Sequence, residues 1–321
     1  MSIWGAGSIF DLQSSIFNPR LTVAVSLMQF EHIAIVGVGL IGGSFGLAVR
    51  RAGVCERITG WDRKEVLDQA LARGVIDGVE RAFESGEPSD ADLVYLAAPV
   101  GAILSFLRAR ASSLKPGAIV TDAGSTKRDI CRVAREALPR EVSFIGGHPM
   151  AGSERTGVEF ADADLFIGAA YALIAGDGAA AEGVRTITET VKAIGARPIA
   201  LTAAQHDRIA ARISHSPQLI STALALTVAG KDDTDALSLG GSGFAEMTRL
   251  AESRWSVWED ICRSNADEIT SALDEAIAQI EALRMAISSG DFSSVGDMFG
   301  AAGEYARVLR ESKRGGAQNT E

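Results

Sequence analysis

Short apolar runs and amphipathic stretches alternate along the first two thirds of the chain. Residues 33–36 (IAIV) form a run rich in β-branched residues that is followed at once by glycines, which is typical of a buried parallel strand. Residues 40–52 then carry the spacing of a helix. The same succession continues, with strands expected at 57–62, 92–99, 118–124, 143–150, 171–176 and 197–201, and helices at 64–73, 127–138 and near 180–194. Strands that alternate with helices predict an α/β fold, a doubly wound parallel sheet with helices on both faces.

The pattern changes after about residue 202, where strand signals disappear. Residues 203–230 form one long helical pattern that Pro217 interrupts, and further helical patterns cover 243–253, 255–265 and 266–290. In the last of these, an apolar stripe follows helical spacing at Ile269, Leu273, Ile277, Ile280 and Leu283. The sequence therefore predicts an all-helical second half that packs on itself, on the first domain or on a second copy.

These patterns divide the chain into four segments. Residues 1–30 are expected to be a dispensable N-terminal extension, because they lack a basic start and their apolar run is too short to span a bilayer. Residues 31–201 form the first domain and 202–311 the helical domain. The polar residues 312–321 are expected to be a disordered tail.

Composition narrows the class of function. The net charge of −10 argues against nucleic-acid or anionic-membrane binding, although a local arginine cluster can still bind a small anion. Cys55, Cys131 and Cys262 lie far apart and form no metal-binding spacing, so we expect no structural metal. Their odd number suits a reducing compartment, and we expect a cytoplasmic protein.

A glycine-rich motif joins the first predicted strand to the first predicted helix. Gly37, Gly39 and Gly42 have the spacing G-x-G-x-x-G, which allows a tight turn, a close approach of a pyrophosphate and packing of the helix on the strand. Asp62 follows the last glycine by 62 − 42 = 20 residues, where a carboxylate can accept a hydrogen bond from a ribose 2′-OH. This favours NAD, while the neighbouring Arg63 keeps NADP open. The expected cofactor contacts are Gly37, Gly39, Leu40, Ile41, Gly42, Asp62, Arg63, Ala98, Pro99 and Asp122.

Several polar side chains lie at the ends of later strands. Because ligands of open α/β sheets bind outside the carboxyl ends of the strands, Ala98 and Asp122 are expected at the same edge as the glycine turn. His148 also ends a predicted strand, within GGHPMAGSE, and a neutral imidazole there suits a general base near neutral pH. Ser125 either caps the next helix or has a functional role, and Thr126 is expected to cap that helix.

Five motifs in this order resemble the prephenate/arogenate dehydrogenase family of tyrosine biosynthesis. They are GVGLIGGS, DAGSTK, GGHPMAGSE, HDRIAARISHSPQ and GFAEMTRLAES with a following tryptophan, and they extend from about residue 31 to 285. The resemblance implies a Rossmann-type domain joined to a helical dimerisation domain. It also implies a homodimer that uses NAD or NADP to decarboxylate a cyclohexadienol oxidatively.

The resemblance also implies roles for individual residues. His148 would be the catalytic base, and Ser125 would share its hydrogen-bond network. The substrate site would contain His215, Arg249, Glu154 and Trp258, with Arg249 pairing with a substrate carboxylate. By contrast, His206 is expected to be an ordinary helix-face residue and Lys127 a solvated neighbour of the site.

Two questions of function stay open on the sequence alone. Many family members have Lys or Arg four residues before the motif arginine, where this chain has Ala245, so either prephenate or arogenate fits as substrate. The rival functions are a β-hydroxyacid dehydrogenase, for which Lys231 would be the acid/base group, and a non-catalytic NAD-sensing module.

Overall fold

The computed structural model describes residues 29–152, 155–176, 179–229 and 238–318. In this part of the chain an eight-stranded sheet has the order β3-β2-β1-β4-β5-β6-β7-β8. The strands are β1 (Phe30–Val36), β2 (Cys55–Trp61), β3 (Gly78–Val79), β4 (Leu93–Leu96), β5 (Ile119–Asp122), β6 (Ser143–Pro149), β7 (Ala170–Ala175) and β8 (Arg197–Ala200). The predicted α/β architecture is confirmed, and the predicted N-terminal extension lies outside the described residues apart from its last two positions, 29 and 30.

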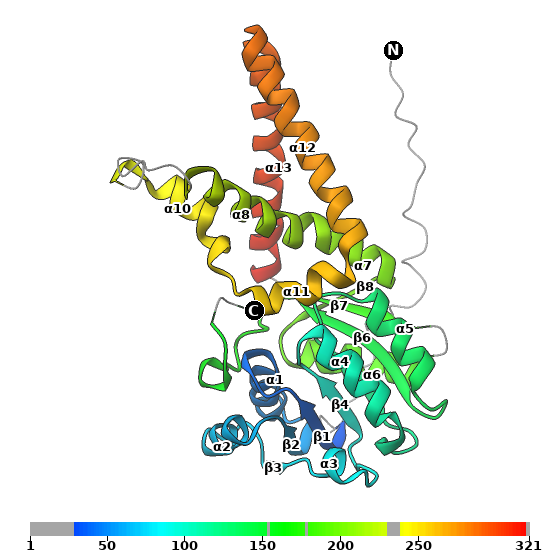
Figure 1. Ribbon diagram of the computed structural model, residues 1–321. Helices are drawn as coiled ribbons and strands as arrows, with labels where there is room; N and C mark the ends of the chain where they lie inside the picture. Colours follow the sequence, from blue (N-terminus) through cyan, green and yellow to red (C-terminus); the bar gives the residue numbers. More distant parts are fainter. Residues whose placement is uncertain (1–28, 153–154, 177–178, 230–237, 319–321) are drawn as a thin grey trace.

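Helices cover both faces of this sheet (Figure 1). One face packs against α1 (Leu40–Arg51), α2 (Lys64–Ala72) and α6 (Ala181–Ala193). The other packs against α3 (Ala82–Ser85), α4 (Val100–Arg110) and α5 (Arg128–Ala137). Neighbouring residues of one strand serve opposite faces, as with Ile35 toward α1 and Ala34 toward α4, because side chains alternate along a strand. Both faces are therefore apolar, which explains the nearly continuous hydrophobic runs in the sequence.

Two neighbouring strands, β7 and β8, depart from the predicted parallel arrangement. β6 pairs with β7 in the antiparallel direction, with His148 opposite Ala172, whereas β1, β2, β4, β5 and β6 run parallel to one another. Direction cannot be read from apolar runs, since a strand buried on both faces has the same pattern either way. Because β6 runs parallel to β5, the end of β6 that carries His148 lies at the same edge of the sheet as the glycine turn.

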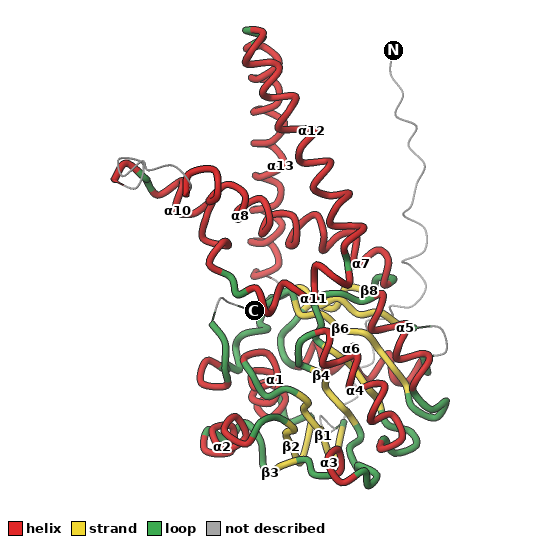
Figure 2. Tube along the Cα trace, viewed as in Figure 1, coloured by secondary structure: helices red, strands yellow, loops and turns green. Residues whose placement is uncertain are grey.

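The second half is helical, as predicted, and it lies over that edge of the sheet (Figures 1 and 2). Its elements are α7 (Ala203–Ala210), a π-helical turn (Ala211–His215), α8 (Ser216–Ala229), α10 (Ser242–Thr248), a 3-10 turn (Arg249–Glu252), α11 (Trp255–Ser264), α12 (Ala266–Ser289) and α13 (Phe292–Gln318). Helices α12 and α13 project from the body as a long hairpin. Within the described ranges, no helix combines the length and apolar composition that a membrane span requires.

Some elements were not predicted from the sequence. Helix α4 was missed between two strand patterns, and the short β3 and α3 were missed with it. The tail that was expected to be disordered from residue 312 continues α13 as far as Gln318. The long pattern at 203–230 is not one continuous α-helix, since the π-helical turn interrupts it just before Pro217.

Candidate active site

The glycine turn has the geometry that a bound diphosphate requires. Gly37 has φ +88°, which side chains rarely tolerate, and a Cβ on Gly42 would lie 2.0 Å from the carbonyl oxygen of Gly37. A Cβ on Gly39 would meet nothing within 4 Å, so this residue borders open space. Leu40 and Ile41 begin α1. Its N-cap residue is Gly39, which has no side chain that could cap the helix. The helix N-terminus therefore remains available to an anion.

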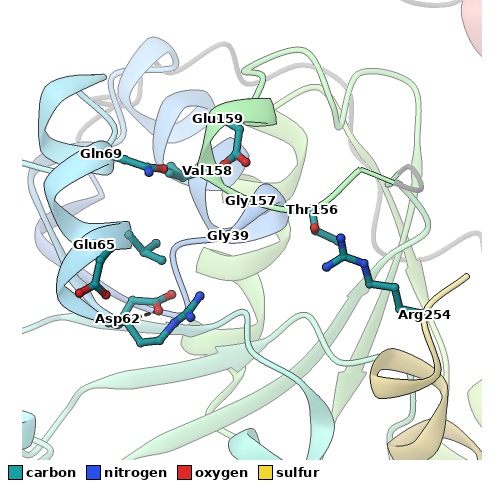
Figure 3. A pocket seen from close by; sticks show the side chains of 11 residues that line it. Gly39, Asp62, Glu65, Gln69, Thr156, Gly157, Val158, Glu159 and Arg254 are labelled. Atoms are coloured by element: carbon teal, nitrogen blue, oxygen red, sulfur yellow. Dashed lines mark hydrogen bonds between the residues drawn. The ribbon is translucent and has the colours of Figure 1, made fainter.

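A cleft of about 650 Å³ extends from Gly39 to the end of β2 (Figure 3). Asp62 lines it, and its carboxylate accepts hydrogen bonds from the backbone N–H groups of Val38 (2.8 Å) and Arg63 (2.6 Å). These contacts fix the carboxylate at the cleft wall, where a ribose hydroxyl could donate to it. Arg63 also lines the cleft and is exposed. The size of the cleft and the carboxylate on its wall fit the adenosine side of a dinucleotide.

Asp122 has a different role from the one predicted. Its side chain is 0 % exposed, and it forms an ion pair with Lys127, which is equally buried. It also accepts hydrogen bonds from the backbone N–H groups of Gly124 (2.8 Å) and Gly147 (3.1 Å). The prediction that Asp122 contacts the cofactor is therefore wrong for its carboxylate, which is buried and bonded to Lys127 and to backbone N–H groups. The expectation of a solvated Lys127 is wrong as well.

Lys127 links the strand that carries Asp122 to the strand that carries His148. Its ammonium group donates to the carbonyl oxygen of Gly147 at 2.6 Å. Position 147 must be glycine, because a Cβ there would lie 2.4 Å from the carbonyl oxygen of Asp122. This close approach of β5 and β6 fixes the backbone directly before His148.

His148 lies half-buried at the end of β6 and belongs to a chain of hydrogen-bonded side chains. Its Nδ1 lies 2.8 Å from Nε2 of His206, and Nδ1 of His206 lies 2.8 Å from Oδ1 of Asp207. Burial would raise the pKa of Asp207, but hydrogen bonds from His206 and from the backbone of α5 hold it below its usual value. Asp207 is therefore an anion that can only accept.

The ionised carboxylate determines how the protons are placed on both imidazoles. His206 donates its Nδ1–H to Asp207, so its Nε2 accepts from Nδ1–H of His148. This leaves Nε2 of His148 with a lone pair. Burial lowers the pKa of His148 well below 6.5, with further contributions from His206, Lys127 and His215. The imidazole is thus a neutral base whose accepting nitrogen is set by its neighbours.

A third histidine completes the cluster from the π-helical turn. His215 is 1 % exposed, accepts at Nδ1 from the Asn265 amide at 3.2 Å, and packs edge-on against Trp258 with the ring centres 6.0 Å apart. Burial lowers its pKa to about 4. His206 and His215 are nine residues apart, about two and a half α-helical turns, which would place them on opposite faces. The wider π turn between them reduces this rotation.

The remaining predicted site residues are placed less centrally. Ser125 follows β5, is half-buried, and makes no hydrogen bond to a described residue. The side chain that bonds to His148 is that of His206. Arg249 is exposed at the start of its 3-10 turn, and no ion pair joins it to the described part of the chain. Ala98 and Pro99 lie between β4 and α4 at the predicted edge. Glu154 and Lys231 lie outside the described residues.

The prediction that Thr126 caps α5 is wrong. The helix begins at Arg128, and neither Ser125 nor Thr126 caps it. Asp207 does so instead, with its carboxylate accepting from the backbone N–H groups of Lys127 (2.7 Å) and Arg128 (2.9 Å). Thr126 bonds to Ser264 of α11 at 2.8 Å.

Sequence reasoning missed His206 and Asp207 as members of the site. Their signal was present, because a His-Asp pair in the first turns of the helix that also carries His215 is an unusual concentration of titratable groups. Three of the four histidines in the chain meet here. Only the fourth, His32, belongs elsewhere, in a buried contact with Thr59 and Asp90.

Two family models match the chain over these domains. The nucleotide-binding domain of prephenate dehydrogenase matches residues 45–200, and the dimerization domain of prephenate dehydrogenase matches residues 202–301. The chain is 32 % identical to the prephenate dehydrogenase of Lactococcus lactis subsp. cremoris over 293 residues, which cover 90 % of this chain and 80 % of that protein.

Solved structures show the same architecture. The prephenate dehydrogenase of A. aeolicus, in complex with hydroxyphenyl propionate and NAD+, is 26 % identical and matches with a TM-score of 0.79, over 88 % of this chain and 98 % of that one. Synechocystis arogenate dehydrogenase is 27 % identical, with a TM-score of 0.75 over 87 % of this chain and 99 % of that one. By sequence, fold and domain order, this chain belongs to the prephenate dehydrogenase family of oxidoreductases.

Proposed function

We propose that this protein catalyses the oxidative decarboxylation of prephenate to 4-hydroxyphenylpyruvate, with hydride transfer to NAD. The observation that carries the proposal is the hydrogen-bonded chain from Asp207 through His206 to His148, at the same sheet edge as the glycine turn. It supplies an oriented neutral base next to a site that fits a dinucleotide. The match to prephenate dehydrogenases supports the choice of substrate.

The side chains present are sufficient for the proton transfer. NAD, when bound, accepts the hydride from the carbinol carbon of the substrate. Nε2 of His148 takes the hydroxyl proton as the carbonyl forms, and the positive charge that develops is stabilised through His206 by the Asp207 carboxylate. The carbon dioxide then leaves with its bonding electrons remaining in the ring, which becomes aromatic and takes a proton on oxygen. His148 can return that proton.

The substrate side rests on the resemblance of individual motifs. In this proposal Arg249 holds a substrate carboxylate through its planar guanidinium group, and Ser125 orients the hydroxyl. Glu154, which lies outside the described residues, is assigned to the substrate site by the same resemblance. His215 and Trp258 form the wall, and their edge-on packing, with His215 held by Asn265, supports that placement.

The cofactor choice rests on Asp62. A carboxylate at this position accepts from a ribose 2′-OH and repels a 2′-phosphate, and its two backbone hydrogen bonds hold it in place. We therefore propose NAD as the cofactor, with NADP as the weaker alternative because Arg63 is adjacent. Cys55, Cys131 and Cys262 are free thiols, which suits the cytoplasm as the compartment in which we place this reaction.

Steady-state kinetics with both substrates and both nicotinamides tests the proposal. We expect turnover with prephenate and NAD, followed by the absorbance of the reduced nicotinamide, and a lower kcat/KM with arogenate or with NADP. A higher kcat/KM with arogenate would reassign the substrate. Binding of NAD without turnover of either substrate would favour the sensing module and overturn the proposal.

We also propose that the chain forms a homodimer through its helical half. The buried apolar cluster described there is small and consists of Ala211, Ile261, Ile269 and Ala272. By contrast, the α12–α13 hairpin exposes many large apolar side chains, including Ile277, Ile280, Met285, Ile287, Phe292, Phe299 and Tyr305. A surface of this kind is typical of an interface. The dimerization-domain model covers most of it.

A further inference from the structure

One side chain from the helical half lies in the cleft of the nucleotide-binding domain. Arg254, the N-cap residue of α11, lines the same cleft as Gly39 and Asp62. Figure 3 shows its guanidinium group directed into the cleft beside Thr156, on the side opposite Asp62. The glycine motif gave no reason to expect a contact from a residue more than two hundred positions later.

The charge of Arg254 is available to a ligand. It is exposed, and no ion pair or hydrogen bond joins its side chain to the residues that the structure describes. The carboxylate of Asp62 already accepts two backbone N–H groups, and Glu65 and Glu159 line the cleft from the nucleotide-binding domain. An anion at Gly39 would lie between the N-terminus of α1 and a guanidinium group that makes no ion pair or hydrogen bond with the described residues.

Helix α11 holds Arg254 in a defined position. Asp260 accepts from the backbone N–H of Gly101 at 2.8 Å, which ties the middle of α11 to the start of α4. At the other end, Ser264 bonds to Thr126, and Asn265 donates to the carbonyl oxygen of Asp207 at 2.9 Å. The helix is thus anchored to both the nucleotide-binding domain and the histidine cluster, so its first turn is presented rigidly.

We propose that Arg254 binds the diphosphate of the dinucleotide across the cleft from Gly39, so that the helical domain contributes directly to cofactor affinity. A guanidinium group matches phosphate oxygens with two parallel N–H donors. The diphosphate is the expected partner because Arg254 shares its cleft with Gly39 and Asp62, whereas His148 does not line it. This inference rests on the proposed dinucleotide-binding function.

The test compares ligands that carry the diphosphate, NADH and ADP, with adenosine, which lacks it. Binding of NADH, ADP and adenosine is measured by calorimetry for the wild type, Arg254→Gln, Arg254→Lys and the matched control Arg263→Gln. Arg263 is an exposed arginine on the same helix that pairs with Glu259 at 2.9 Å, away from the cleft. All four proteins should fold, because neither arginine is buried.

For Arg254→Gln we expect the Kd of NADH and ADP to rise about tenfold, the effect of losing one charge-assisted contact, while adenosine binding stays unchanged. Arg254→Lys should recover part of the loss, Arg263→Gln should match the wild type, and added salt should narrow the difference. Unchanged ADP binding, an equal loss for adenosine, or a rise only in the KM for prephenate would each overturn the inference. Failure of the wild type to bind NADH or ADP would instead overturn the cofactor assignment on which it rests.

Discussion

At the scale of single residues, Asp207 connects the folding of the site with its chemistry. One carboxylate accepts from the backbone of Lys127 and Arg128, which starts α5, and from the imidazole of His206. The same group therefore caps a helix of the nucleotide-binding domain, and it sets the tautomer of His206 in the helical domain and, through it, that of His148 in the nucleotide-binding domain. Such a contact is invisible in the sequence, because Asp207 and Lys127 are brought together only by the packing of α7 on α5.

The histidine pair leads to a first prediction. Replacing His206 with Leu removes the acceptor for Nδ1–H of His148, so the base loses its fixed tautomer and kcat should fall roughly 10- to 100-fold. His206→Gln keeps an amide oxygen that can accept, and it should retain more activity. The KM for NAD should change little in both variants. Equal activity of the Leu variant and the wild type would show that His206 does not position the base.

At the scale of elements, the α12–α13 hairpin is the least self-contained part of the fold. The stripe predicted on α12 is buried only at its start, with Ile269 5 % exposed, whereas Ile277 and Ile280 are 61 % and 58 % exposed. An amphipathic pattern shows which side of a helix is apolar but not whether the partner is the same chain or a second copy. This is why the sequence left both possibilities open.

The hairpin should therefore control assembly. Ile280→Glu places a charge in the apolar surface and should convert a dimer into a monomer, because an unpaired carboxylate is costly to bury. Leu71→Glu is the matched control, since Leu71 is an exposed apolar residue on α2 of the nucleotide-binding domain. Sedimentation velocity distinguishes the two. A dimeric Ile280→Glu protein would place the interface elsewhere.

The elements also show what the sequence could predict. Apolar periodicity located most strands and helices to within a few residues, as for β1 and α1, because burial on one or two faces leaves a regular pattern. It missed α4, which lies between two buried strands and is itself apolar along much of its length. The glycine turn and His148 were recognisable from local motifs, whereas the Asp122–Lys127 pair required the three-dimensional contact of β5 and β6.

At the scale of the whole molecule, α11 lies where the two halves meet (Figure 1). Its first turn carries Arg254 in the dinucleotide cleft, its middle contacts α4 through Asp260, and its end meets the histidine cluster through Asn265. One helix thus contacts the cleft, α4 and the histidine cluster. The buried side chains near this junction include His215, which is neutral, and Asp207, which pairs with His206.

His215 contributes to the pH dependence of unfolding. Its pKa is about 4 in the folded protein, against 6.5 in the unfolded chain, so only the unfolded chain takes up the proton between these values. The free energy of unfolding should therefore fall as the pH drops from 6.5 to 4, with His215 contributing about 3 kcal/mol at the lower end. Urea unfolding at a series of pH values measures it. His215→Gln should show a shallower decline, and an identical pH profile would contradict the burial argument.

The role of His148 as the base is tested by the activity of His148→Asn, compared with the affinity of this variant for NADH. Asparagine keeps a polar side chain of similar size but cannot accept the hydroxyl proton, so kcat should fall about 10²- to 10⁴-fold, while the Kd for NADH stays that of the wild type. Turnover at the wild-type rate, or a loss of NADH affinity as large as the loss of rate, would contradict the role of His148 as the base.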